Sequence, residues 1–346
     1  MTLKSWAKKS VLAHALYYGG KAGMARYHKE RKKAFLHAIG QGMPWTKALP
    51  YELRDGHTFH DAQRGREKLC IILAGHKPEL WHTVFGRIEA WIPKDVDVCV
   101  MTSGVHVPVL IEMCARNGWS YLSTRHNKLT RIQNLAIHLH PKAQYIYKLD
   151  EDMFVTQGFF DRLLQTYRQA AGESRYDIAF AAPLIPLNGY GYVRVLEKCG
   201  LLDDWERRFG KAVCTDGKHH HAAIMEQGAA ARYMWGETCP VLRDIDALAD
   251  RFGQEPPAYT VCPIRFSIGA ILFSRRSWLD WGMFPVDWTN GMGLDEEHIA
   301  HVCMYHGKVG VVSENALAGH LAFGPQARDM LAYYQRDRSR FEGGSI

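Results

Sequence analysis

The most informative stretch of this chain is Tyr145-Ile-Tyr-Lys-Leu-Asp-Glu-Asp-Met-Phe-Val155. A short apolar segment of strand length, Gln144–Leu149, runs directly into three consecutive acids, Asp150, Glu151 and Asp152. In open α/β sheets, ligands bind at the carboxyl ends of the strands. Neighbouring carboxylates raise each other's pKa, and a divalent cation removes that penalty. The acids therefore predict a Mg²⁺ or Mn²⁺ site, against the alternative of an acidic turn that merely closes a strand.

Strand-like and helix-like segments alternate on both sides of this stretch. This alternation predicts a mixed, mostly parallel sheet flanked by helices. The expected strands are Leu69–Ala74, Val96–Thr102, Trp119–Ser123, Gln144–Leu149, Asp177–Ala182 and Ser267–Phe273. The expected helices are Glu79–Ala90, Val107–Asn117, Lys128–Leu139, Gly158–Ala171 and Asp295–Tyr305.

Length and composition indicate one large domain with additions at both ends. The chain has 346 residues, is 47% hydrophobic and has a net charge of +7, which suits a protein that meets anions. We expect a basic helical N-terminal extension over 1–67 and a main domain over 68–325. The main domain divides into a nucleotide-binding half, 68–183, and an acceptor half, 184–325, in which glycine-rich turns and an irregular stretch precede the last strand and helix. A helical tail follows over 326–346.

The N-terminal extension is strongly basic. Nine lysines and arginines stand against one acid, Glu30, before residue 35. Two interpretations remain open: an amphipathic element, Met1–Lys33, that lies on an anionic membrane, or a solvated helical extension. No stretch approaches the roughly 20 apolar residues that span a bilayer. We expect a cytoplasmic protein, peripheral on the inner face of a membrane in the first interpretation, with its eight cysteines reduced.

Five short segments, in this order along the chain, resemble those of GT-A glycosyltransferases, which use nucleotide-sugar donors. The strand that ends in Asp150-Glu-Asp152 resembles their DxD segment. The resemblance implies a GT-A-like, Rossmann-type sheet, a divalent metal ion (Mn²⁺ or Mg²⁺) and a UDP-linked donor. It further implies inverting transfer to a glycan or glycolipid, as in bacterial surface-polysaccharide glycosyltransferases. The segments are Asn127–Ala136, Tyr145–Val155, Phe266–Phe273, Gly291–Glu297 and Gly319-His320.

The resemblance also assigns the metal and donor sites. Asp152, Asp150 and His320 are the implied metal ligands, and a histidine at the edge of the core is the alternative for His320. The implied donor-binding residues are Asp150, Arg131, Lys148 and Asn127. Arg131 instead belongs to a solvated helix face in the alternative interpretation. A buried Lys148 needs a partner, so it pairs with an acid or approaches the phosphates.

The late acidic segment supplies the candidate catalytic base. Asp295-Glu296-Glu297 follows a glycine-rich turn and opens a helix. An inverting transfer needs a carboxylate that takes the acceptor's proton, and Glu296 is placed first for this role, with Asp295 second. Acids in a first helical turn are also favoured by the helix dipole. One departure from the family is Met101-Thr-Ser-Gly104, where relatives have acids that recognise the base, so no side chain is assigned to that task.

Two other classes of protein remain as alternatives. A sugar-phosphate nucleotidyltransferase needs a glycine-rich phosphate loop after the first strand, but Leu73–Glu79 contains one glycine. A non-catalytic glycan- or nucleic-acid-binding protein gains nothing from acids clustered at two places, and no nucleic acid is expected as a partner. We interpret His219–His221 as part of a mobile polar loop, with an acceptor or metal contact as the alternative.

Overall fold

The computed structural model describes residues 56–216, 222–286 and 291–343. All of them belong to the compact unit Glu52–Ile346. The predictions for the basic extension, including the membrane contact of Met1–Lys33, concern residues that lie almost wholly outside this part of the chain. The same holds for the predicted loop His219–His221.

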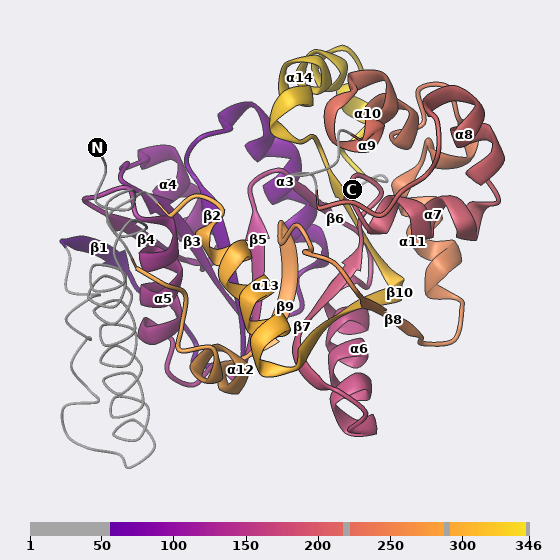
Figure 1. The fold of residues 1–346 in the computed structure, drawn as a ribbon. Helices are drawn as coiled ribbons and strands as arrows, with labels where there is room; N and C mark the ends of the chain where they lie inside the picture. The colour runs from indigo at the N-terminus through magenta and orange to yellow at the C-terminus, as the bar shows by residue number, and fades with distance from the viewer. Residues whose placement is uncertain (1–55, 217–221, 287–290, 344–346) are drawn as a thin grey trace, which may run out of the picture. The chain divides into compact units, whose positions relative to one another are not determined.

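A large mixed sheet forms the centre of the described unit (Figure 1). The strand order is β1-β4-β3-β2-β5-β9-β7-β10-β6, and β8 pairs with β10. The bounds are β1 His57–His60, β2 Lys68–Ala74, β3 Val96–Ser103, β4 Ser120–Thr124, β5 Tyr145–Asp150, β6 Met153–Val155, β7 Asp177–Leu184, β8 Tyr259–Cys262, β9 Ala270–Ser274 and β10 Lys308–His320.

The central strands form two parallel groups, and the antiparallel pairs join these groups or lie at the margins of the sheet. β4, β3, β2 and β5 run parallel, and β7 pairs parallel with β10. Between these two groups lies β9, which is antiparallel to both β5 and β7. The carboxyl ends of β2, β3, β5, β7 and β10 therefore meet at one edge of the sheet, which is the edge where α/β proteins bind ligands.

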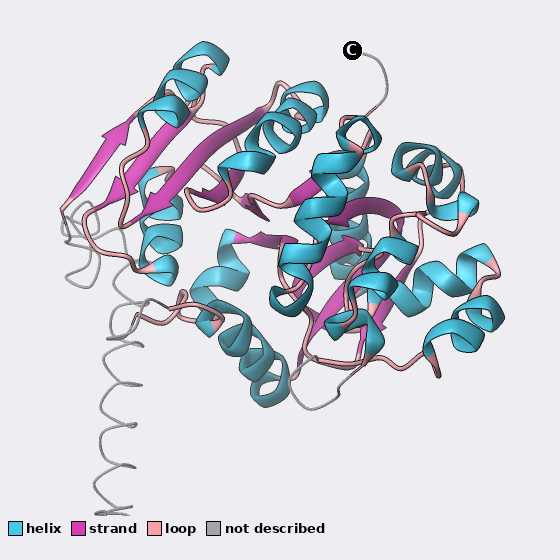
Figure 2. Cartoon of the chain, turned by 90° about the horizontal axis from the view of Figure 1, so that it is seen from above, coloured by secondary structure: helices cyan, strands magenta, loops and turns pink. Residues whose placement is uncertain are grey.

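Helices cover both faces of the sheet (Figure 2). The five helices predicted within the main domain agree with the structure to within two residues at each end. The bounds are α3 Pro78–Trp91, α4 Pro108–Asn117, α5 Leu129–Leu139, α6 Phe159–Glu173, α7 Gly191–Cys199, α8 Leu202–Phe209, α9 Ala223–Glu226, α10 Gly228–Met234, α11 Ile245–Gly253, α12 Arg275–Asp280, α13 Leu294–His306 and α14 Ala327–Arg336. Within the described residues, short 3₁₀ helices occur at Pro240–Leu242, Gly324–Gln326 and Arg338–Arg340.

The structure differs from the expected organisation in two places. β1 lies within the predicted extension 1–67, yet it pairs with β4, so the sheet begins before residue 68. Its alternating, half-exposed pattern has no apolar run that would have revealed it. The stretch expected to be irregular after Leu184 contains α7 to α11. These helices have nine residues or fewer, so none of them shows three full turns of the periodicity on which prediction depends.

The C-terminal helix packs onto the main body. Tyr333, Tyr334 and Phe341 are buried, and the buried guanidinium of Arg87 donates to the Phe341 carbonyl at 2.6 Å. The predicted tail therefore contributes to the same core as the sheet. None of the described helices is long and apolar enough to cross a membrane. All eight cysteines are free thiols.

Candidate functional site at the carboxyl edge of the sheet

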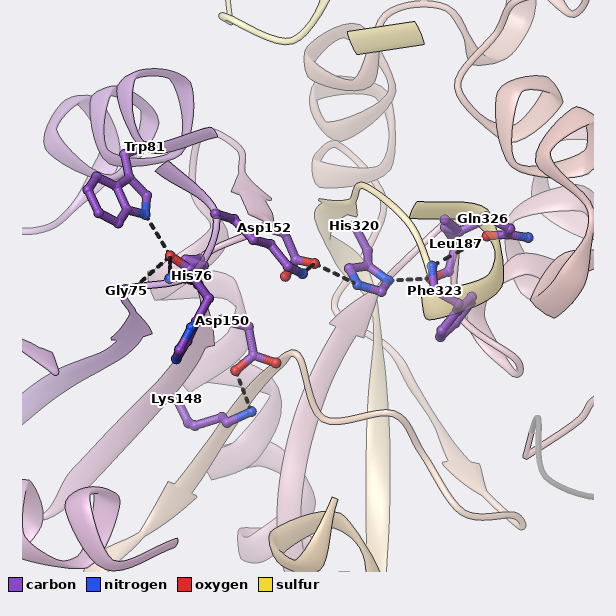
Figure 3. A network of polar contacts seen from close by, with 12 residues as sticks. Gly75, His76, Trp81, Lys148, Asp150, Asp152, Leu187, His320, Phe323 and Gln326 are labelled. Atoms are coloured by element: carbon purple, nitrogen blue, oxygen red, sulfur yellow. Dashed lines mark hydrogen bonds and ion pairs between the residues drawn. The ribbon is translucent and has the colours of Figure 1, made fainter. Parts of the chain in front are cut away.

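Asp152 lies between two basic side chains, and Figure 3 shows one of them, His320. β6 pairs antiparallel with the end of β10, opposing Met153 to His320, and this pairing brings the imidazole beside Asp152. His320 Nε2 lies 3.3 Å from Asp152 Oδ2, and Lys77 Nζ contacts the same oxygen. His320 Nδ1 lies 3.1 Å from the Leu187 carbonyl, which favours a proton on Nδ1. Nε2 faces the Asp152 carboxylate, and a cation bound beside Asp152 would take the place of a proton on this nitrogen.

The opposite charges of Asp152, His320 and Lys77 shift the pKa values of these three side chains more strongly than their burial does. Burial would raise the pKa of Asp152, but His320 and Lys77 outweigh it and lower that pKa well below its usual value. Burial would lower the pKa of His320, yet the Asp152 carboxylate outweighs it and raises that pKa. The Lys77 pKa is raised for the same reason against its own burial. Asp152 is therefore ionised and stabilised by two basic groups of the protein.

Glu151 holds the loop that follows β2. Its carboxylate accepts the backbone N–H groups of Gly75 and His76, each at 2.9 Å, and the indole N–H of Trp81 at 2.6 Å. Only 6% of Glu151 is exposed, so these donors take the place of water. This Glu151 clamp fixes the loop whose next residue, Lys77, reaches Asp152.

Asp150 binds Lys148, the buried lysine two residues earlier on β5. Lys148 Nζ donates to Asp150 Oδ1 at 2.8 Å and to the Ile268 carbonyl at 2.9 Å. Burial would lower the pKa of Lys148, but the surrounding acids outweigh it and raise that pKa. Of the two interpretations of Lys148, the structure shows the pairing with acids. Gly269 follows Ile268, and a Cβ there would lie 2.9 Å from the Met153 sulfur, so a side chain at this position would force Met153 to move.

Lys148 also connects Asp150 with the late acidic segment. Asp295, in the first turn of α13, has its Oδ2 4.0 Å from Lys148 Nζ. The same oxygen accepts a hydrogen bond from Gln133 Nε2 of α5 at 3.0 Å. Two acidic segments from distant parts of the chain therefore meet around one buried ammonium group.

Glu296 points to a different set of neighbours. Its Oε1 accepts a 2.5 Å hydrogen bond from Arg265 Nε, in the loop before β9. Burial raises the pKa of Glu296, and Arg265 only partly opposes that effect. A carboxylate with a raised pKa is a better proton acceptor near neutral pH than an ordinary glutamate.

The predicted donor contacts Asn127 and Arg131 lie just beyond the carboxyl end of β4. Asn127 is exposed and its backbone packs against Gly104, where a Cβ would lie 2.7 Å from the Asn127 nitrogen. Arg131 is half-buried in the first turn of α5. A cavity of about 440 Å³ opens nearby, at the ends of β3 and β4. Its lining comprises Gly56, His57, Thr58, Gly104, Val105, His106, Ser123, Thr124 and Arg125.

Asp152 and His320 fit a divalent cation as two of its ligands, because carboxylate oxygen and imidazole nitrogen both suit Mn²⁺. Asp150, the third predicted ligand, binds Lys148 instead. Among the described residues, no three His, Cys, Asp or Glu side chains converge in an arrangement that could hold a metal ion. A cation at this place would need its remaining ligands from phosphate oxygens and water, which is how Mg²⁺ is commonly bound.

Sequence analysis did not find three residues of this site. Lys77, Gln133 and Arg265 each contact one of the predicted acids. Lys77 could have been found, because it follows a strand that ends at the same edge of the sheet as β5. Gln133 and Arg265 approach their acids only through tertiary packing, which leaves no local pattern in the sequence.

Comparison with known proteins gives no family for this chain. No family model matches it, and no curated protein matches its sequence. Among solved structures, it is similar to mannosyltransferase PcManGT from Pyrobaculum calidifontis in complex with GDP-Man and Mn²⁺, at 12% identity and a TM-score of 0.43. That match covers 94% of this chain and 76% of the other. A mycobacterial protein matches at 13% identity and a TM-score of 0.39, covering 82% and 78%.

Proposed function

We propose that this protein is a metal-dependent glycosyltransferase that transfers a sugar from a UDP-linked donor to a glycan or glycolipid acceptor. The observation that supports the proposal is the meeting of two separate acidic segments at the ligand-binding edge of the sheet. Asp150 and Asp295 approach Lys148 there, while Asp152 faces His320 and Lys77. A protein that only binds glycans would have no use for this concentration of charge.

In this proposal, one side of the site binds the diphosphate. Asp152 and His320 would hold the divalent cation, which when bound stabilises the negative charge that develops on the leaving diphosphate. Lys77 is placed to turn from Asp152 toward the phosphates. Asn127 and Arg131 would contact the nucleoside, because both follow β4, whose last residues line the cavity at the ends of β3 and β4.

The other side of the site takes the acceptor's proton. Glu296 is the proposed base because burial raises its pKa and because Arg265 fixes its orientation. Asp295 is better suited to positioning, since Gln133 and Lys148 already surround its carboxylate. A base on the side of the acceptor implies inversion at the anomeric carbon.

Two measurements test the mechanism. NMR of the product should show the anomeric configuration opposite to that of the donor, and retention would contradict the mechanism. Glu296→Gln should lower kcat by at least a hundredfold, as expected for loss of a general base. Near-normal turnover in both Glu296→Gln and Asp295→Asn would contradict the residue assignment.

The class of reaction is tested by donor hydrolysis with a panel of nucleotide sugars, with and without Mn²⁺. Release of the nucleoside diphosphate only with the metal ion supports the proposal. A sugar-phosphate nucleotidyltransferase would instead release pyrophosphate from a nucleoside triphosphate and a sugar 1-phosphate. A binding protein would turn over neither substrate.

A further inference from the structure

A second cavity lies beside α13 and has Glu296 in its lining. It has a volume of about 540 Å³ and is lined by α13 together with residues of β7, β8, β10 and the loop before β9. Most of its wall is apolar or thiol. The lining residues that the argument uses are Phe180, Ile264, Phe266, Ile299, Ala300 and Cys303.

The cavity follows one face of α13. Glu296, Ile299, Ala300, Cys303 and Met304 all line it, and their spacing of three and four places them on one side of the helix. Eight residues of α-helix extend about 12 Å. The cavity is therefore elongated, with the carboxylate of Glu296 at one end of this face and Met304, which is 77% exposed, at the other.

Charge is concentrated in a few of the lining residues. Arg265 pairs with Glu296, and Lys308 pairs with Asp177 at 2.6 Å, while Asp216 is the remaining charged residue of the wall. Burial raises the pKa of Cys262 to about 12 and that of Cys303 to about 11, so both are neutral thiols at physiological pH. Such a wall offers few hydrogen-bond partners to a glycan, and it favours hydrocarbon.

We propose that this cavity binds the hydrocarbon chain of a glycolipid acceptor whose sugar hydroxyl lies at Glu296. The inference rests on the proposed function, because it takes Glu296 as the base. It selects a glycolipid from the two classes of acceptor, since only an acceptor with an apolar chain would gain from the elongated apolar wall. Exposed Met304 marks the end of the helix face through which a longer chain would leave.

The binding test uses alkyl glucosides, below their micelle concentrations, on the full-length protein. Calorimetry should show that octyl β-glucoside binds at least a hundredfold more tightly than methyl β-glucoside. Each methylene group that enters the cavity should increase the affinity about fourfold, which is the factor that corresponds to the transfer of one CH₂ group out of water. Equal affinity for the two glucosides would overturn the proposal.

Matched variants on α13 locate the binding. Ala300→Trp fills the cavity and should weaken octyl glucoside binding at least tenfold, while methyl glucoside binding stays unchanged. His301→Trp adds the same side chain at an exposed neighbouring position and should behave as wild type. Unchanged octyl glucoside binding in Ala300→Trp would overturn the proposal.

A labelling measurement on the wild-type protein avoids any effect of the variants on folding. Octyl glucoside should slow alkylation of the partly exposed Cys303 at least fivefold, whereas methyl glucoside should not, with Cys303→Ser identifying the labelled site. Unprotected labelling would contradict the placement of the chain. Donor hydrolysis is measured separately: octyl-specific binding without cleavage of any nucleotide sugar would support the cavity and refute the glycosyltransferase.

Discussion

Asp152 is the residue on which the metal proposal depends most directly. Its carboxylate contacts the imidazole of His320 and the ammonium group of Lys77, so these side chains compensate its negative charge without a metal ion. A cation that binds Asp152 Oδ2 would therefore compete with Lys77 for this oxygen. The three adjacent acids alone suggested that a metal ion is needed for charge balance, and the structure shows that the protein supplies the balance itself.

Asp152→Asn should abolish metal-dependent donor binding and leave the fold intact. The amide keeps the shape of the side chain but loses the charge that would hold the cation. Calorimetry with donor and Mn²⁺ measures the effect, and Asp203→Asn, at an exposed position in α8, is the control. Unchanged donor affinity in Asp152→Asn would remove the proposed metal site.

His140 makes the stability of the protein sensitive to acid. It is 2% exposed, its Nδ1 donates to the Ala136 carbonyl at 2.7 Å, and its Nε2 is buried without a hydrogen-bond partner in the described structure. Burial lowers the pKa of His140, helped by Arg275 and partly opposed by Asp97 and Asp61. His140 therefore binds a proton more weakly in the folded protein than in the unfolded chain.

The sign of the effect follows from this lowered pKa. His140 is neutral in both states above its unfolded pKa of about 6.5, and stability is lost as the pH falls from there toward the folded pKa. His140→Asn keeps a donor near Nδ1 but cannot titrate. Denaturant unfolding at pH values between 7 and 5 gives the free energy of unfolding as a function of pH. The slope of this free energy against pH should be smaller in the variant by up to about 1.4 kcal/mol per pH unit. Equal slopes would refute the assignment.

Local sequence predicted the acids of the site but not their partners. Asp150, Asp152, Asp295 and Glu296 follow recognisable strand or helix boundaries, so the chain itself indicates where they lie. The contact of Glu296 with Arg265 depends on how the loop before β9 crosses α13. The periodicity of a few neighbouring residues cannot predict such a tertiary contact.

At the level of elements, the Glu151 clamp joins the turn after β5 to the loop after β2. Neither segment belongs to a helix or strand, yet three donors of the β2 loop and α3 converge on one buried carboxylate. The position of Lys77 follows from this clamp. Sequence analysis treated Glu151 only as a member of an acidic triplet, because its partners lie about 70 residues earlier in the chain.

Glu151→Gln should destabilise the protein and weaken donor binding together. The amide keeps one acceptor oxygen but points an NH₂ group at backbone donors, and a buried unsatisfied donor costs about 1–3 kcal/mol. Thermal unfolding and donor calorimetry measure the two effects. Glu112→Gln, at an exposed position of α4, is the control. Wild-type stability would mean that the clamp does not hold the loop.

Strand prediction succeeded where strands are buried on both faces. β2, β3 and β5 are apolar runs in the interior of a parallel sheet, and such runs are visible in sequence. β1, β6 and β8 contain three or four residues each, and their existence depends on a partner strand. β9 was predicted as a strand, but its antiparallel direction between β5 and β7 was not.

At the scale of the whole molecule, β9 joins the two parallel parts of the sheet. Its register with β5 runs from Tyr145 opposite Ser274 to Leu149 opposite Ala270. Without it, one edge of buried β5 would be exposed. The N-terminal part of the main domain, although it has the strand and helix alternation of a nucleotide-binding unit, therefore lacks a complete sheet of its own.

A chain divided at the exposed Glu255–Pro257 segment tests this dependence. The fragment 1–256 should not unfold cooperatively by itself, because β8, β9 and β10 are missing. Mixing it with the fragment 257–346 should restore a cooperative unfolding transition, measured by circular dichroism. The control is protein that has folded as one chain and is then cleaved at the same place. A cooperative transition of 1–256 alone would show that β9 is dispensable.

The late position of β9 in the chain also affects how the protein is made. Ribosomes add about 5–20 residues per second, so β9 emerges on the order of ten seconds after β5. Throughout that interval the nascent chain presents an unpaired apolar strand edge, which is prone to aggregation. Cells that produce this protein from a strong promoter at high temperature should therefore accumulate insoluble material, and slower translation or a holding chaperone should increase the soluble yield.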